Sequence, residues 1–215
     1  MIRVHKDTTV PSSLLTTQRY DGHDVISQLY LDQHEKCYIC ERKLKTDDEI
    51  EHLRSQVNFH ELRQDWNNLF LACGYCNKRK LNHYDDILCP KDINIEEEIK
   101  HELSFYDNKA DFTPLLSSVQ HKNTVALLNR IFNGKNNHPR TIKEERFFEN
   151  ALSEINSFYE LTIGYLRNKT LHKKKEIKDE LAIDKEFLGF KYWIIRDNPD
   201  LLMDFENDII WNKIY

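Results

Sequence analysis

Two cysteine pairs, Cys37-Tyr-Ile-Cys40 and Cys73-Gly-Tyr-Cys76, decide how this sequence is interpreted. Two thiolates three residues apart in a tight turn can bind one ion, and four thiolates without an open position make a structural zinc site. Residues 41–72 between the pairs are a longer insert than the common zinc ribbon has. The alternatives are two unrelated pairs or a thiol redox pair, which would need a βαβ context that the sequence does not show. We therefore expect one Zn²⁺ site that encloses a segment of definite shape.

The insert itself predicts a small hairpin followed by a helix. Residues 48–53, DEIEHL, alternate apolar and charged side chains, which is typical of a short strand. Residues 54–68 are polar and predict a loop, and the apolar run 69–73, LFLAC, predicts a second strand. From Gly74 onward the chain can turn into a helix. The predicted order is strand, loop, strand, helix.

Outside this region, apolar residues at helical spacing predict most of the remaining elements. Residues 1–22 are expected to be an irregular lead-in to a helix over 23–34. A helical segment over 114–133 follows later, and a long amphipathic helix should begin at the capping box Thr141–Glu144. The basic run 167–178 is expected to be a solvated helix face, with contact to nucleic acid as the less favoured reading.

The composition is that of a globular, mainly helical protein. The 215 residues are 40% hydrophobic and 31% charged, and Gly and Pro number only 5 each, which argues against an all-β fold rich in turns. The net charge of −5 means that binding to nucleic acid would need a local basic surface. No apolar run is long enough to span a bilayer and the N-terminus has no signal-like apolar stretch, so a cytoplasmic location is expected. Cys89 has no partner by spacing and should be a free thiol.

The residues around the second cysteine pair carry a family resemblance. Glu49-Ile-Glu51-His52 is followed by Asn68-Leu-Phe-Leu-Ala-Cys-Gly-Tyr-Cys-Asn77-Lys-Arg-Lys80. This order resembles the acid-His, Asn-Leu and Cys-x-x-Cys-Asn-x-x-Lys pattern of the HNH endonucleases, including the spacing of nine between the two asparagines. The resemblance covers about residues 36–82.

The resemblance implies a site that hydrolyses phosphodiesters. His52 is then the general base, since an imidazole with a pKa near 6.5 is a free base at neutral pH. Glu51 and Asn77 are then ligands of a catalytic Mg²⁺ or Mn²⁺, ions that prefer oxygen donors, and Glu49 is a less favoured third ligand. Adjacent strand residues point to opposite faces, so a bend or a metal near the strand axis must bring Glu51 and His52 together. Some members carry a further His where this chain has Leu81, which leaves the ion few protein ligands.

The remaining motif residues are expected to support that site. Asn68 would organise the loop through side-chain hydrogen bonds to the backbone, so that His52 is held in place. Basic side chains near the helix start and in the loop can contact phosphate. These predicted nucleic-acid contacts are Arg54, Lys78, Arg79 and Lys80.

A closer resemblance extends into the flanks. The segments DVISQLYLDQHEKCYICERK, EIEHLRSQ, DWNNLFLACGYCNKRK and NTVALLNRIFNG look like the PtuB-type HNH effectors of Septu and retron anti-phage systems. Many of those proteins read Phe-Arg-Pro-Lys where this chain has Leu53-Arg54-Ser55-Gln56, so the loop departs from the pattern. The resemblance implies a PtuA-like partner ATPase, with a reverse transcriptase and its msDNA in the retron versions. The sequence leaves phage DNA and a tRNA as alternative substrates.

Together these observations predict an α+β fold that is mostly α-helical. Residues 1–35 are assigned to the lead-in and first helix, residues 36–90 to a zinc-stabilised ββα-metal core, and residues 91–215 to a helical region that completes the core and docks a partner. The function predicted is a metal-dependent endonuclease acting as a defence effector. A zinc-stabilised adaptor without catalysis and a stand-alone restriction-like or homing-like nuclease are the alternatives.

Overall fold

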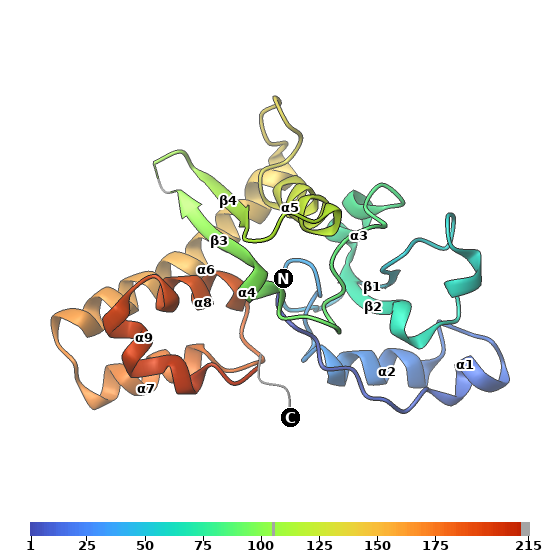
Figure 1. The fold of residues 1–215 in the computed structure, drawn as a ribbon, viewed down its shortest axis with the longest axis horizontal. Coiled ribbons are helices and arrows are strands. Elements are labelled where there is room, and N and C mark those ends of the chain that lie inside the picture. The colour runs from blue at the N-terminus through green and yellow to red at the C-terminus, as the bar shows by residue number, and fades with distance from the viewer. Residues whose placement is uncertain (105, 212–215) are drawn as a thin grey trace.

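The computed structural model describes residues 1–104 and 106–211. Figure 1 shows two groups of elements joined by a central hairpin and helix. One group comprises α1 (Ser12–Thr16), α2 (His23–Asp32), β1 (Asp48–His52), β2 (Leu69–Cys73) and α3 (Gly74–Lys80). The centre holds α4 (Ile95–Glu98), β3 (Ile99–Ser104), β4 (Lys109–Pro114) and α5 (Val119–Phe132). The other group comprises α6 (Ile142–Arg167), α7 (Leu171–Glu180), α8 (Leu188–Arg196) and α9 (Pro199–Phe205).

The predicted hairpin between the cysteine pairs is present. β1 and β2 pair antiparallel, with Glu51 opposite Phe70 and His52 opposite Leu69. The residues of β2 are all buried, as a continuous apolar run predicts, and the connection contains two short 3-10 turns. α3 begins directly after β2, so strand, loop, strand and helix follow in the predicted order.

A second hairpin lies in the region that the sequence predicted to be helical. β3 and β4 pair antiparallel, with Ile99 opposite Pro114 and Ser104 opposite Lys109. The inward positions of β3 are Ile99 and His101, and those of β4 are Ala110 and Phe112. A short lead-in helix, α1, was not predicted either. The fold is therefore mixed α/β, with two small sheets and a largely helical C-terminal region.

The long helix α6 begins as the sequence predicts. Thr141 caps it and Glu144 completes a capping box, with both reciprocal hydrogen bonds present. The preceding helix α5 ends at Phe132 with Asn133 as its C-cap, and Gly134 has a φ of 82°, a conformation that glycine adopts without steric cost. These signals separate two helices that pack against each other.

The core is shared among distant parts of the chain. One cluster of buried apolar side chains includes Leu29 of α2, Phe70 of β2, Phe132 of α5 and Phe190 of α8. A second cluster lies among the C-terminal helices and includes Phe158 of α6. Residues 37–83 therefore have no separate core of their own. Among the described helices, none combines the length and apolar character needed to cross a membrane.

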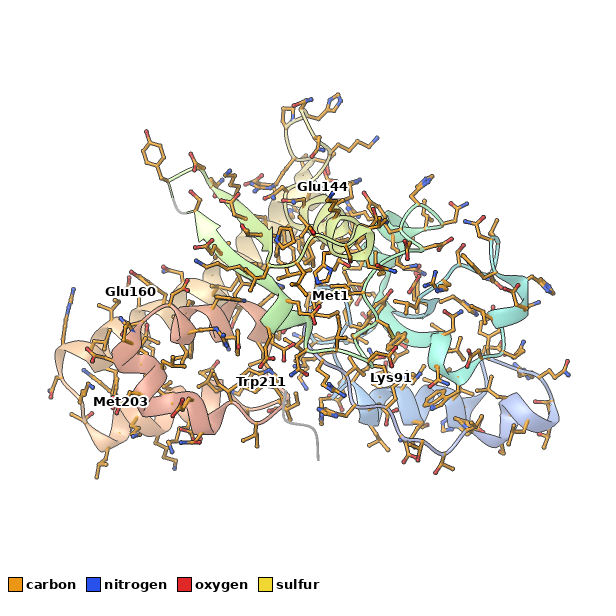
Figure 2. All side chains as sticks on the ribbon, viewed as in Figure 1. Met1, Lys91, Glu144, Glu160, Met203 and Trp211 are labelled. Carbon is orange, nitrogen blue, oxygen red and sulfur yellow. The ribbon has the colours of Figure 1, made fainter. Side chains whose placement is uncertain are left out.

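The N-terminal amino group lies at the centre of this packing, as Figure 2 shows for Met1. Its nitrogen is 2.9 Å from Glu41 Oε1 and 3.2 Å from His101 Nε2, and both acidic and basic partners are buried. Glu41 also accepts a hydrogen bond from the Gly189 amide at 3.1 Å. Burial lowers the pKa of His101 to about 3, so its neutral ring accepts from the ammonium. This network joins the first cysteine turn to β3 and α8.

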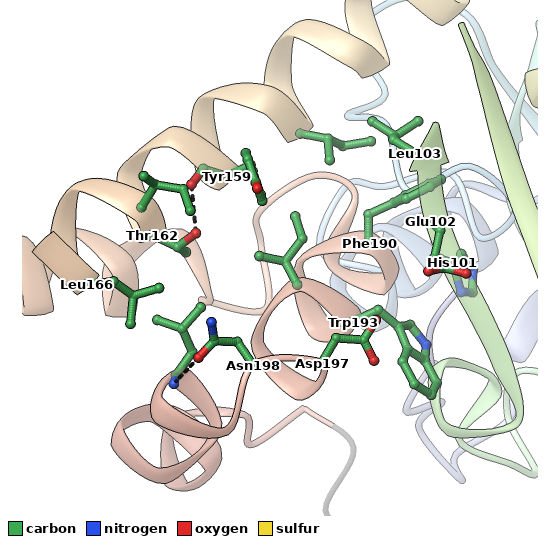
Figure 3. Close-up of a pocket in the computed structure, with 14 residues that line it drawn as sticks. His101, Glu102, Leu103, Tyr159, Thr162, Leu166, Phe190, Trp193, Asp197 and Asn198 are labelled. Atoms are coloured by element: carbon green, nitrogen blue, oxygen red, sulfur yellow. Dashed lines mark hydrogen bonds between the residues drawn. The ribbon is translucent and has the colours of Figure 1, made fainter. Parts of the chain in front are cut away.

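A hollow of about 260 Å³ lies among the C-terminal helices beside β3. Figure 3 shows it between α6 and α8, with Tyr159 and Leu166 on one side and Phe190 and Trp193 on the other. At its rim Asp197 pairs with Lys100 at 3.0 Å. The hollow belongs to the helical region and is not lined by residues of the β1–β2 hairpin or α3.

Candidate functional site

Four thiols gather at the base of the hairpin. The Sγ atoms of Cys37, Cys40, Cys73 and Cys76 all lie within 4.8 Å of one another, and all four residues are buried. A tetrahedral zinc site with Zn–S bonds of about 2.3 Å has sulfur atoms about 3.8 Å apart. The Cys40–Cys73 distance of 3.9 Å agrees with that value, and none of the cysteines is in a disulfide. The four thiolates therefore fit a structural Zn²⁺ ion, whereas Cys89 lies outside the cluster.

Backbone hydrogen bonds shape both cysteine turns. The Cys37 amide donates to the Arg42 carbonyl at 2.9 Å, and the Glu41 amide donates back to the Cys37 carbonyl at 2.8 Å. The Gly74 amide donates to the Asp47 carbonyl at 2.7 Å, which ties the start of α3 to the start of β1. These hydrogen bonds thus fix the end of the hairpin that lies beside the thiols against α3.

His52 lies at the far end of β1, under the loop that follows. Its Nε2 is 3.1 Å from the carbonyl oxygen of Arg63, and the Tyr20 ring packs edge-on against it with centroids 5.0 Å apart. A carbonyl can only accept, so the ring proton resides on Nε2 and Nδ1 carries a free lone pair. Burial lowers the pKa of His52, an effect only partly opposed by its hydrogen bond to Arg63. The ring is thus a neutral base at pH 7. The residue is almost fully buried, with an exposed fraction of 6%.

Asn68 ties the two ends of that loop together. Its Oδ1 accepts from the Arg54 amide at 2.8 Å, and its Nδ2 donates to the carbonyls of Arg54 at 3.0 Å and Leu62 at 3.2 Å. The Leu53 amide also donates to the Asn68 carbonyl at 2.8 Å. Asn68 is itself buried, so these bonds are protected from water. They hold the chain on both sides of the His52 contact with Arg63.

Glu51 points to the other face of β1 and is buried. Its Oε1 is 2.7 Å from Lys80 Nζ and its Oε2 accepts from the Tyr38 hydroxyl at 2.5 Å. Burial raises the pKa of Glu51, and the Lys80 ammonium opposes that rise. Lys80 also donates to the His52 carbonyl at 3.0 Å, so it connects both residues of the acid-His pair to α3.

Asn77 lies one turn before Lys80 and faces a different carboxylate. Its Nδ2 donates to Glu49 Oε2 at 2.6 Å. Among the described residues no hydrogen bond joins Asn77 to Glu51, and no group of three His, Cys, Asp or Glu ligands other than the four thiols comes together. Glu49 and Glu51 therefore lie on one face of β1, where Asn77 of α3 holds the first and Lys80 of α3 holds the second.

The four predicted phosphate contacts have different surroundings. Lys78 is exposed, and Arg54 is partly exposed beside Asp86. Arg79 instead pairs with Glu144 at 3.2 Å and stacks on the Tyr75 ring, while Lys80 has an exposed fraction of 0%. This placement disagrees with the prediction for Arg79 and Lys80, because both side chains are used to hold α3 to its neighbours. Of the four, Lys78 and Arg54 have the more exposed side chains and stay predicted phosphate contacts.

Asp85 is a residue of this site that the sequence did not single out. Its Oδ1 accepts from the Ser55 amide and its Oδ2 from the Ser55 hydroxyl, both at 2.8 Å, and Oδ2 also accepts from Asn58 at 2.6 Å. Lys80 Nζ is 4.0 Å from the same carboxylate. Asp85 thus anchors the loop on the side opposite Asn68. Asp85 follows α3 at a spacing that belongs to no motif, so the sequence carries no signal for it. The contact of Tyr20 with His52 likewise becomes visible only in the fold.

Comparison with known proteins agrees with this geometry. The chain matches none of the curated proteins. The family model described as HNH endonuclease matches residues 37–83, the stretch that contains the thiol cluster, the hairpin, the Asn68 loop and α3. Residues 37–83 of this chain therefore form an HNH endonuclease domain.

Proposed function

We propose that the chain is a metal-dependent endonuclease in which His52 is the general base. The observation that carries the proposal is the hydrogen bond from His52 Nε2 to the Arg63 carbonyl. That bond fixes the tautomer and the ring orientation, so Nδ1 can accept a proton from an attacking water. Asn68 and Asp85 hold the loop that supplies the carbonyl. Both the imidazole and its orienting partner are thus built into the fold.

Mg²⁺ or Mn²⁺ is the proposed catalytic cofactor, with Glu51 and Asn77 as the ligands that the resemblance indicates. The donor set suits such an ion, because carboxylate and amide oxygens are hard ligands. Since Lys80 already neutralises Glu51, the Glu49 carboxylate beside Asn77 is proposed as a further oxygen donor. When bound, the ion would polarise the phosphate and stabilise the leaving oxygen.

The test is nucleic-acid cleavage by the wild type and by His52→Ala in the presence of the partner ATPase, with Mg²⁺ or Mn²⁺ and with plasmid DNA and tRNA as substrates. Loss of a general base should lower the rate by about 10²–10⁴-fold. His60→Ala is a matched control, because His60 is an exposed histidine of the same loop. Equal cleavage by wild type and His52→Ala would overturn the assignment. Nucleic-acid binding without cleavage under every metal condition would favour the adaptor function instead.

The biological role proposed is that of an anti-phage effector of the Septu or retron type, controlled by a PtuA-like ATPase. The support is the resemblance of the flanking segments and a net charge of −5, which suits an effector that is delivered by a partner better than one that binds nucleic acid strongly alone. Copurification with an ATPase encoded next to this chain, and with a reverse transcriptase and msDNA where present, tests the role. A chain that purifies alone and cleaves without such a partner would refute it.

A further inference from the structure

A hollow of about 280 Å³ lies where α3 meets α6. It is lined by the HNH domain on one side and by a helix outside residues 37–83 on the other. The residues that give it its chemistry are Arg42, Glu49, Lys78, Lys143, Arg146 and Asn150. Because α6 supplies half of these, the hollow is a feature of the whole chain rather than of the HNH domain alone.

Both acidic groups at this hollow are hydrogen-bonded, Asp47 to a cation and Glu49 to a neutral amide. Asp47 pairs with Arg42 at 2.6 Å, and Glu49 accepts from Asn77 at 2.6 Å. Lys78, Lys143 and Arg146 are exposed, and within the described part of the chain none of the three forms a hydrogen bond or ion pair through its side chain. The lining thus carries four positive charges against the negative charges of Asp47 and Glu49, which leaves a net charge of +2 in a chain whose net charge is −5.

The two helices that carry these charges are fixed to each other. Tyr75 of α3 stacks on Phe147 of α6 with ring centroids 4.3 Å apart and planes 10° apart. Glu144 Oε1 of α6 forms ion pairs with Arg79 Nη2 at 3.2 Å and with Arg130 Nη1 at 2.7 Å. These contacts hold α3 and α6, which carry the cationic side chains, in a fixed arrangement. Little ordering of the backbone is therefore needed when an anion binds.

We propose that this hollow binds the phosphodiester backbone of the nucleic-acid substrate, with Lys78, Lys143 and Arg146 as phosphate contacts. The inference rests on the proposed nuclease function and extends the substrate surface beyond the HNH domain. Lys and Arg contacts to phosphate position a strand without reading its sequence. The Glu49–Asn77 pair borders the hollow, so a backbone held there lies beside the proposed metal ligands.

A larger neighbouring hollow of about 550 Å³ is excluded from the proposal by its charge. It shares Arg42, Asp47 and Asn150 with the first hollow. Its remaining charged residues are two lysines and two glutamates, Lys43, Lys45, Glu154 and Glu186, so the signs balance. A polyanion gains little electrostatic attraction there.

The experiment compares the salt dependence of binding for two pairs of substitutions. All proteins carry His52→Ala so that no probe is cleaved, and binding is followed by fluorescence anisotropy with a labelled DNA duplex, single-stranded DNA and single-stranded RNA of one sequence. The test variant is Lys143→Gln with Arg146→Gln. The matched control is Lys122→Gln with Lys135→Gln, because both lysines are exposed and lie outside the lining of the hollow. Each double substitution removes two positive charges, so the net charge changes from −5 to −7 in both variants. Melting temperatures confirm that both variants fold.

The test variant should bind more weakly, and its slope of log K against log salt should fall by about 1.8 on duplex DNA or about 1.4 on a single strand. The control should keep the wild-type slope. Single-stranded DNA and single-stranded RNA have the same expected change in slope, so of these two probes the one with the larger loss of affinity identifies DNA or RNA as the backbone bound. An unchanged slope in the test variant, or an equal fall in the control, overturns the hollow as a phosphate site even if the wild type cleaves. A wild type that neither binds nor cleaves any probe in the presence of the partner ATPase overturns the nuclease proposal as well.

Discussion

Replacing the buried Lys80 should destabilise the HNH domain strongly. The Lys80 ammonium has an exposed fraction of 0% and lies 2.7 Å from Glu51, 3.0 Å from the His52 carbonyl and 4.0 Å from Asp85. Lys80→Met keeps the length of the side chain and removes the charge, which leaves the Glu51 carboxylate buried with only the Tyr38 hydroxyl as partner. Removing one member of a buried ion pair costs about 3–5 kcal/mol, so we expect the free energy of unfolding to fall by about that amount.

Urea denaturation of the zinc-loaded protein, followed by tryptophan fluorescence, measures this loss. Lys78→Met is the matched control, because Lys78 is an exposed lysine on the same helix and its substitution should change stability by about 0.5 kcal/mol or less. Glu51→Gln combined with Lys80→Met should recover part of the loss, since a neutral amide is easier to bury than an unpaired carboxylate. A loss of less than about 1 kcal/mol in Lys80→Met, or no recovery in the double variant, would refute the reasoning.

Three further predictions concern zinc, the pH dependence of activity and the pH dependence of stability. The chain should bind one Zn²⁺ through four thiolates, so Cys37→Ser should lower the zinc content measured by mass spectrometry and Cys89→Ser should leave it unchanged, as Cys89 lies outside the cluster. Because burial lowers the pKa of His52 and the base must be unprotonated, cleavage should lose activity only on the acid side of pH 6.5, and a midpoint well above 6.5 would contradict this role. Burial raises the pKa of Glu96 from 4.5 to about 7, so its contribution to stability is fully present below pH 4.5 and is lost as the pH rises through 7. Glu96→Gln should therefore stabilise the chain above pH 7 by up to about 3 kcal/mol in urea titrations, with no gain at pH 4.

The elements around the thiols could be predicted because each follows a strong local pattern. The alternation in 48–53, the apolar run in 69–73 and the capping box at Thr141 all appear in the structure. The β3–β4 hairpin could not be recognised in the same way, since two of its inward positions are His101 and Ala110 rather than large apolar residues. Its packing against α8 compensates for that weak pattern through contacts between distant parts of the chain.

For the candidate site, the sequence predicted which side chains come together less well than it predicted the elements that carry them. Asn68 and His52 lie where the motif indicates and are joined through one loop. The burial of Lys80 was missed because it follows Lys78 and Arg79 and looks like part of one basic run. Helix geometry contained the signal, since residues three apart share a face and Lys80 therefore lies on the side of Asn77 toward β1. Charge composition does not distinguish such a position from a solvated one.

The shared apolar cluster determines how the catalytic segment can be handled. Phe190, far beyond the last motif residue, packs in the same cluster as Phe70 of β2, and Leu29 reaches it from before the first cysteine. Excising residues 37–83 would expose those apolar side chains to water. We therefore expect that the segment does not fold when it is transferred alone to another protein. A proteolytic cut that releases α8 should therefore abolish the proposed nuclease activity rather than activate it.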